Sequence, residues 1–250
     1  MVVSKFTCPS FFSFLLLISS DGFSQLSRIP KWEAGIQVGA YIYQGDLTPH
    51  PAGSIETIQP GIGIMGTRIL NRSFSVRAMF NYARLAADES IYVYPGWRKQ
   101  RNFSFTAAVK ELQISLHWNV LGTGYDDVKY EPYVFAGAGV SVASVSRNYS
   151  RVNYAYFGEK SSVLTGLAID ATASSQQVIP VVPVGAGLRY HVSERIVLNL
   201  EGTYRFMHND YLDGFSYSAN PGFRDHYSSL TIGAAYKFGG KEKYGCPAVN

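Results

Sequence analysis

The segment Tyr227–Phe238 alternates between apolar residues and small or polar residues almost without interruption. Successive side chains of a β-strand point to opposite faces, so this pattern predicts a strand with one apolar face. The apolar face carries Leu230, Ile232, Ala234, Tyr236 and Phe238, and the other carries Ser229, Thr231, Gly233, Ala235 and Lys237. The second set suits an enclosed wet interior better than a dry core. We therefore expect this segment to be the closing strand of a transmembrane β-barrel, with its apolar face in lipid.

Seven further segments have the composition or the alternation of β-strands. They are Trp32–Tyr43, Ile58–Leu70, Phe74–Ala86, Phe103–Val120, Tyr130–Val145, Val181–His191 and Ile196–Phe206. In Phe103–Val120 the apolar positions change parity partway, and we expect a β-bulge near Val109–Glu111. Both faces of Tyr130–Val145 are apolar or small, so its orientation stays open.

The connections between these segments alternate between long and short. The long ones are Gly45–Thr57, Asp88–Asn102, Arg147–Ile179 and His208–Asp225, and the short ones are Asn71–Ser73, Thr123–Lys129 and Val192–Glu194. Outer-membrane barrels have short periplasmic turns and long extracellular loops. The predicted fold is therefore all-β, an eight-stranded antiparallel up-and-down transmembrane β-barrel. A lipocalin-like soluble barrel is the alternative, and its inward face would be the apolar one.

The N-terminus has the features of a secretory signal peptide. Lys5 supplies positive charge, Phe11–Ile18 is an apolar stretch too short to span a bilayer, and Gly22 and Ser24 are small residues before a cleavage site. We expect residues 1–24 to be the signal peptide, residues 25–238 the outer-membrane barrel and residues 239–250 a short periplasmic tail. Cleavage would remove Cys8 and leave Cys246 as a single thiol without an internal disulfide.

Composition and charge narrow the possible partners. The formal net charge is only +4, and no run of Lys or Arg is present, so nucleic acid is not an expected partner. The 24 glycines, 18 tyrosines and 15 phenylalanines favour a β-rich chain with many turns.

Charged residues occupy the predicted inward faces. They are Glu33, Arg77, Glu111, Arg189, Glu201, Arg205 and Lys237, four positive and three negative groups. An eight-stranded barrel is just wide enough for its own side chains, so we expect a lumen network of paired charges that plugs the barrel. Selective passage of small solutes is the alternative.

Candidate chemistry in the loops is weak. His208 or His226 with Asp210 or Asp225 would provide a base and an acid, but no serine stands in a catalytic frame beside them. A metal site from Asp210, Asp213 and Asp225 matches no known ligand spacing. We expect no catalytic residue, no metal and no cofactor.

Aromatic residues gather at the ends of the predicted strands. Trp32, Trp118, Tyr190 and Phe238 fall at the periplasmic ends, and Tyr43, Tyr82, Phe103, Phe206 and Tyr227 fall at the loop ends. The pattern predicts two aromatic girdles at the membrane interfaces.

Two short stretches carry a family resemblance. Gly39–Pro49 includes Gly45, Asp46 and Leu47, and Arg101–Phe105 includes Arg101, Asn102 and Phe103. Together they resemble motifs of the PorG-like outer-membrane barrels of Bacteroidota, a family of the DUF6089 type.

The resemblance implies a non-enzymatic membrane component of the type IX protein secretion machinery. The implied partners are outer-membrane lipid and periplasmic secretion-ring proteins. The ring proteins would be met through the turns Asn71–Arg72, Thr123–Lys129 and Ser193–Glu194. Two other roles stay open: a small barrel acting as a minor pore or surface-binding protein, and a lipid-modifying enzyme.

Overall fold

A computed structural model describes residues 32–122, 128–158, 161–207, 212–219 and 225–238 of the chain. The predicted signal peptide, the predicted tail, Cys8, Cys246 and Asp210 lie outside the described residues. Within them, no helix is long and apolar enough to cross a lipid bilayer.

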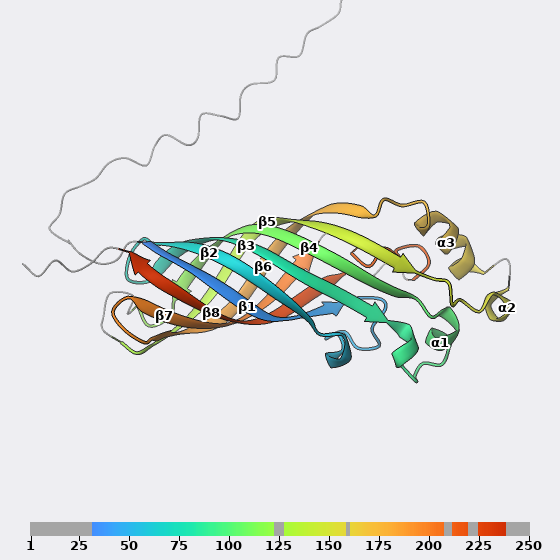
Figure 1. Cartoon of the computed structure of the whole chain (residues 1–250), viewed down its shortest axis with the longest axis horizontal. Coiled ribbons are helices and arrows are strands. Elements are labelled where there is room, and N and C mark those ends of the chain that lie inside the picture. The colour runs from blue at the N-terminus through green and yellow to red at the C-terminus, as the bar shows by residue number, and fades with distance from the viewer. Residues whose placement is uncertain (1–31, 123–127, 159–160, 208–211, 220–224, 239–250) are drawn as a thin grey trace, which may run out of the picture.

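Eight antiparallel strands close into a barrel in which each strand pairs with its neighbours in the sequence (Figure 1). The strands are β1 (Trp32–Gln44), β2 (Gln59–Ile69), β3 (Phe74–Asp88), β4 (Ser104–Asn119), β5 (Tyr130–Asn148), β6 (Gln176–His191), β7 (Ile196–Met207) and β8 (His226–Phe238). The predicted fold class is thus confirmed.

The first and last strands form the closing seam. β1 and β8 pair along their full length, from Trp32 opposite Phe238 to Gln44 opposite His226. The apolar face predicted for β8 points out of the barrel, where Leu230 and Ile232 are exposed, while Ser229 and Thr231 are buried inside. The prediction that Tyr227–Phe238 is the closing strand of the barrel is therefore confirmed.

The loops and turns segregate to opposite ends of the barrel. The short helical elements η1 (Ile55–Thr57), η2 (Glu89–Ile91), α1 (Trp97–Arg101), α2 (Tyr154–Phe157) and α3 (Ser162–Asp170) belong to the long connections. Helices α1, α2 and α3 lie at one end of the molecule, and the start of β1 and the end of β8 lie at the other (Figure 1). The predicted third loop, Arg147–Ile179, was too long, because β5 continues to Asn148 and β6 begins at Gln176.

The predicted β-bulge in β4 is wrong. The pairing of β4 with β5 continues without a break from Ser104 opposite Asn148 to Asn119 opposite Tyr133. Phe105 and Val109 point inward like Glu111, so the odd-numbered residues of β4 face the interior along the whole strand. The apolar positions change because the interior itself changes from polar to apolar along β4.

The interior is polar near the short turns and apolar near the long loops. The polar half holds Glu33, Gln37, Arg77, Asn81, Glu111, Gln113, His117, Glu131, Asn199, Glu201, Thr203, Arg205 and Thr231, all buried. The apolar half is a core cluster that includes Tyr41, Tyr43, Leu85, Phe103, Phe105, Val109, Val145, Ile179, Val181, Met207, Leu212, Phe215 and Tyr227. The expectation of a wet interior fails in this second half, because the loops fold over that end of the barrel and exclude water from it.

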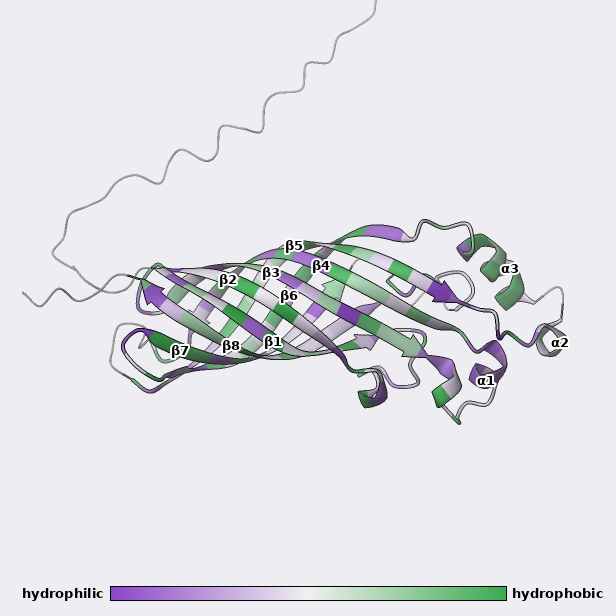
Figure 2. Ribbon diagram, in the orientation of Figure 1, coloured by the Kyte–Doolittle hydropathy of each residue, from purple (hydrophilic) through white to green (hydrophobic). Residues whose placement is uncertain are grey.

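The outer surface follows the same alternation along every strand. Hydrophobic positions repeat along the strands between paler or hydrophilic ones (Figure 2). The orientation left open for β5 is now fixed: Val134 and Val140 point outward, while Glu131, Tyr133 and Phe135 point inward.

Candidate functional site

Two groups of buried and partly buried side chains define the candidate site. The first is the lumen network of Glu33, Arg77, Glu111, Glu131, Arg189, Glu201, Arg205 and Lys237. The second, which we call the loop cap, comprises Glu89, Arg98, Arg101, Asp170, Asp213 and Asp225 with the loops that carry them.

Two fully buried ion pairs cross the middle of the lumen. Arg77 Nη1 lies 2.7 Å from Glu201 Oε2, and Arg205 Nε lies 3.0 Å from Glu111 Oε1. Tyr133 donates a 2.7 Å hydrogen bond to Glu201. Each pair joins strands on different sides of the barrel, so the side chains bridge the lumen rather than line a passage.

Aromatic rings enclose the Arg205 guanidinium. Its Cζ atom lies 5.4 Å from the ring centroid of Tyr41 and 5.0 Å from that of Tyr227. Tyr227 also donates a hydrogen bond to Glu111, and Asn81 donates another at 3.0 Å. The buried charges thus have the additional partners that an ion pair needs to be tolerated away from water.

A third group lies at the end of the lumen near the short turns. Arg189 Nη2 lies 2.5 Å from Glu33 Oε1, and Arg189 Nη1 lies 3.4 Å from Glu131 Oε2. His191 Nε2 contacts Glu131 at 2.8 Å, and Lys237 Nζ lies 3.0 Å from His191 Nδ1. These contacts link β1, β5, β6 and β8 across the opening of the barrel.

The structure brings together all seven charged residues predicted for the lumen and adds Glu131. With Glu131 the four cations face four carboxylates, so the apparent excess of positive charge disappears. Sequence reasoning missed Glu131 because it lies in the strand whose faces were not assigned. Its i, i+2 alternation with the inward residues Tyr133 and Phe135 is the signal that would have identified it.

A small cavity of about 20 Å³ lies beside this network, lined by Ser75, Arg77, His117, Asn119, Glu131, Tyr133 and Arg189. That volume holds about one water molecule.

The loop cap is organised around Glu89, whose side chain is fully buried. Arg101 donates to both carboxylate oxygens, Arg98 donates to Oε1 at 2.9 Å, and the Phe103 backbone N–H donates to Oε2 at 3.2 Å. Burial lowers the pKa of Arg98, and the carboxylate of Glu89 opposes that shift. Glu89 therefore fixes α1 against the end of β3.

The two family-motif stretches meet at this cap. Arg98 also donates to the backbone carbonyls of Asp46 at 2.8 Å and Thr48 at 3.1 Å, and Leu47 between them is fully buried. Asn102 ends α1 in the left-handed conformation, with φ of 53°, which turns the chain into β4. Gly45–Leu47 and Arg101–Phe103 thus form one structural unit, which the sequence did not reveal because Glu89 and Arg98 lie outside both motifs.

The fourth loop contributes Asp213, Phe215 and Asp225 to the cap, and these residues contact Tyr43 and Phe103. The Phe103 ring stacks on that of Phe215, with centroids 4.3 Å apart and an interplanar angle of 8°. The Tyr43 hydroxyl, which has one proton to share between them, lies 2.7 Å from Asp213 Oδ2 and 2.6 Å from Asp225 Oδ1. Asp213 and Asp225, two of the three acids considered for a metal site, therefore serve as acceptors for a buried tyrosine. The described residues contain no group of three or more side chains that could hold a metal ion.

The third loop is tied down by Asp170, the last residue of α3. Its buried carboxylate accepts hydrogen bonds from the backbone N–H groups of Tyr217 and Ser218, at 3.1 and 2.8 Å. Arg147 donates to the backbone carbonyls of Asp170 and Ala173, the latter at 2.6 Å. Segments from all four long connections therefore pack together at one end of the barrel.

The aromatic residues divide between the outer surface and the core. Trp32, Trp118, Tyr190 and Phe238 lie on the outer surface near the short turns, between 37% and 53% exposed. Of the second predicted girdle, Tyr82 and Phe206 point outward. The prediction that Tyr43, Phe103 and Tyr227 belong to this girdle is wrong, because they point inward and form part of the apolar core under the loops.

A buried Ser–His contact lies in the lumen, where Ser115 Oγ is 2.8 Å from His117 Nε2. The His117 ring stacks on Phe135 at 4.8 Å, and no described carboxylate binds its other nitrogen. A nucleophile–base pair normally requires an orienting acid and access to substrate. Ser115 and His117 are 2% and 4% exposed.

A closed antiparallel barrel with an apolar outer face and a filled interior defines a membrane-spanning β-barrel protein. The chain belongs to the family described as "Domain of unknown function (DUF6089)", whose model matches residues 10–240. The family predicted from the two motifs is confirmed at this level. A search of curated proteins found no match.

Several solved structures of bacterial barrels are similar to the chain. The attachment invasion locus protein Ail of Yersinia pestis is 16% identical, covers 83% of this chain and 99% of its own, and has a TM-score of 0.44. Neisserial surface protein A is 15% identical, the match covers 83% of this chain and 97% of that protein, and the TM-score is 0.46. The outer membrane protein OprG from Pseudomonas aeruginosa is 13% identical, the match covers 82% of this chain and 95% of that protein, and the TM-score is 0.39.

Proposed function

We propose that this protein is a non-enzymatic outer-membrane barrel that anchors periplasmic components of the type IX secretion machinery. The observation that carries the proposal is the closed interior: ion pairs bridge one half of the lumen, and an apolar core under the loop cap fills the other. A barrel built this way is suited to hold partners at the membrane rather than to pass solutes. The type IX assignment itself rests on the resemblance of Gly39–Pro49 and Arg101–Phe105 to PorG-like barrels.

In this proposal the periplasmic partners meet the short turns, where Arg72 and Glu194 are exposed. The signal peptide directs the chain across the inner membrane, and the tail at residues 239–250 extends the periplasmic face.

Deletion of the gene tests the proposal. Proteins that carry a type IX sorting domain should then accumulate inside the cell instead of reaching the medium or the cell surface. A charge-reversal variant, Arg72→Glu with Glu194→Lys, should keep the barrel folded and lower co-purification of periplasmic ring proteins. Normal secretion in the deletion strain would contradict the anchoring role.

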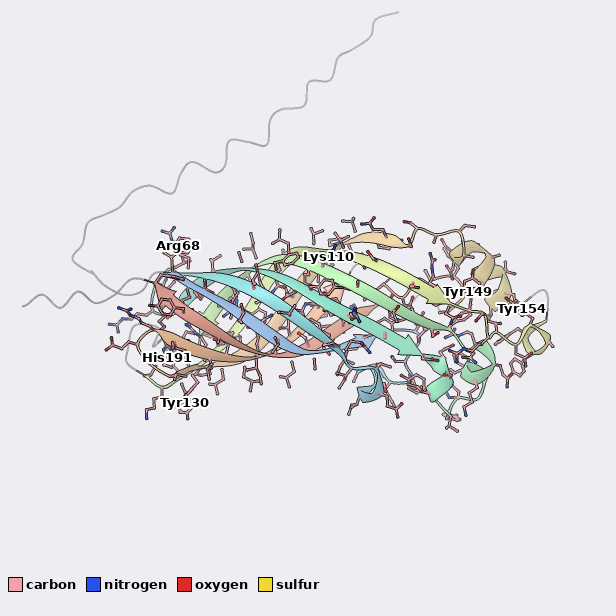
Figure 3. The ribbon with its side chains drawn as sticks, viewed as in Figure 1. Arg68, Lys110, Tyr130, Tyr149, Tyr154 and His191 are labelled. Atoms are coloured by element: carbon pink, nitrogen blue, oxygen red, sulfur yellow. The ribbon has the colours of Figure 1, made fainter. Side chains whose placement is uncertain are left out.

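Surface binding is a second candidate function, favoured by the ordered loop cap. Tyr154 and Tyr156 of α2 are more than half exposed, and Tyr154 lies beyond the strands of the barrel (Figure 3). A strain that secretes normally but loses attachment to a surface ligand when the α2 loop is replaced would favour this alternative. The minor-pore function predicts stable conductance in planar bilayers. The ion pairs that bridge the lumen do not favour such conductance.

A further inference from the structure

The outer face of the barrel changes from apolar to polar at one level on neighbouring strands. Phe80, Leu112, Val140 and Pro180 face outward in one row across β3, β4, β5 and β6. Closer to the loops, the outward row across β4 and β5 consists of Thr106 and Ser146, followed by Ser104 and Asn148. This change marks the edge, on the side of the long loops, of the surface that suits lipid tails.

Two cations lie at that edge. Arg84 of β3 and Lys110 of β4 are exposed on the outer face, and Tyr82 lies opposite Lys110 while Arg84 lies opposite Ala108. Arg84 and Lys110 are thus diagonal neighbours, about 7–8 Å apart in an antiparallel ladder. Within the described part of the chain, neither side chain has an ion pair or a hydrogen bond.

The nearest outward acid on β3 is already occupied. Asp88 Oδ2 lies 3.2 Å from Arg151 Nη2, so the chain itself leaves the two cations uncompensated. Arg or Lys on the lipid face is strongly destabilising at the bilayer midplane and costs little near the interface. A pair of outward cations without counter-charges is therefore least costly at the level of the membrane interface.

A groove lies on the loop side of the pair, where Ala86 follows Arg84 on the outward face of β3 and Thr106 lies opposite Ala86 on β4. It has a volume of about 460 Å³ and is lined by Glu56, Thr57, Gln59, Ala86, Ala87, Asp88, Ile91, Ser104, Phe105, Thr106, Ser146 and Asn148. Hydroxyl and amide groups of this kind match the hydroxyl groups of a sugar.

We propose that Arg84 and Lys110 bind the phosphate of an outer-leaflet glycolipid and that its sugar occupies this groove. Arginine and lysine bind phosphate through charge-assisted hydrogen bonds, and their side chains here are free to turn toward the headgroup. The inference rests on the outer-membrane location in the proposed function but not on a role in secretion.

Arg68 provides a matched control. It also faces outward, but it lies near the other end of the barrel from the loop cap, whereas Lys110 lies midway along the molecule (Figure 3). The guanidinium of Arg68 stacks over Trp32, 5.2 Å from the ring centroid.

The test is lipid titration of the folded barrel in detergent, followed by native mass spectrometry. The probes are lipid A with its two phosphates, the same glycolipid without phosphates, and inorganic phosphate alone. Arg84→Gln and Lys110→Gln should each weaken binding of phosphorylated lipid A about tenfold. Arg68→Gln, Arg84→Lys and Lys110→Arg should bind it as the wild type does, and heat-modifiable gel migration should show that every variant is folded.

Three results would overturn the proposal. These are unchanged affinity in the Arg84→Gln/Lys110→Gln double variant, equal binding of the dephosphorylated glycolipid, and binding of inorganic phosphate as tight as that of the lipid. Failure of the secretion role would appear only in the deletion strain, so the two proposals are tested separately.

Discussion

Arg101 donates two hydrogen bonds to the carboxylate of Glu89, with 2.9 Å from Nε to Oε2 and 2.5 Å from Nη2 to Oε1. Both side chains are almost completely buried at the loop end of the barrel. Because Arg98 and the Phe103 N–H use the same carboxylate, Glu89 connects the second loop to the first family-motif stretch. These contacts hold Gly45–Leu47 and Arg101–Phe103, which are far apart in the sequence, in one structural unit.

Replacing Glu89 by glutamine should destabilise the loop cap. The variant leaves two buried guanidinium groups without a carboxylate, and removing one partner of a buried ion pair costs about 3–5 kcal/mol. Urea unfolding of the barrel in lipid vesicles would measure the loss, and faster proteolysis of the loops would locate it. Asp88→Asn is the control, because its pair with Arg151 is exposed and such pairs contribute about 0–1 kcal/mol. Equal effects of the two substitutions would contradict the role of Glu89.

Gly45→Ala should also destabilise the cap, for a steric reason. A Cβ atom at Gly45 would lie 2.1 Å from both Asp225 Oδ1 and Tyr43 Oη, which are hydrogen-bonded to each other. Overpacking of this kind costs about 1–3 kcal/mol. Gly96→Ala is the matched control in a loop, since nothing lies within 4 Å of its added Cβ. We expect a lower urea midpoint for the first variant alone, and a shift of the same size in both would remove the steric explanation.

The strand pattern predicted the barrel because period-2 alternation and loop lengths are local properties of the sequence. β8 shows this directly: its outward residues Leu230 and Ile232 and its inward residues Ser229 and Thr231 lie where the alternation puts them. The seam with β1 follows from closure, since an open edge in a membrane leaves backbone groups unpaired.

The interior of the loop end was not predictable in the same way. In β4 the inward side chains Phe105 and Val109 are as apolar as the outward Leu112, so alternation alone suggested a bulge. What decides their orientation is the loop cap that covers them, and this depends on contacts between distant loops. Glu89 illustrates the point, because nothing in its local sequence distinguishes a fully buried carboxylate from an exposed loop residue.

Arg205 and Glu111 should show strong energetic coupling in the lumen. Glu111→Gln alone leaves the buried Arg205 uncompensated, whereas the same change in an Arg205→Met background does not. We expect a coupling energy of about 1–3 kcal/mol from the double-mutant cycle, measured by urea unfolding in vesicles. The exposed pair Arg151–Asp88 is the comparison cycle and should give a much smaller value. Additive effects at Arg205 and Glu111 would mean that the lumen is hydrated enough to screen the pair.

The orientation of the barrel in a bilayer can be measured through its three tryptophans. Trp32 and Trp118 are about half exposed on the outer surface at the ends of β1 and β4, where aromatic side chains meet the membrane interface. Trp97 lies in α1 of the loop cap, with Arg98 and Arg101 at 4.9 and 4.8 Å from its ring. Brominated acyl chains quench the fluorescence only of tryptophans close to them.

The test uses three variants that each keep one tryptophan. The variants that keep Trp32 or Trp118 should be quenched in brominated lipid, and the variant that keeps Trp97 should not. Phenylalanine replaces the other two tryptophans in each variant, and gel migration checks that each is folded. Quenching of Trp97 as strong as that of Trp118 would place the loop cap in the lipid and contradict the membrane boundary at Arg84 and Lys110.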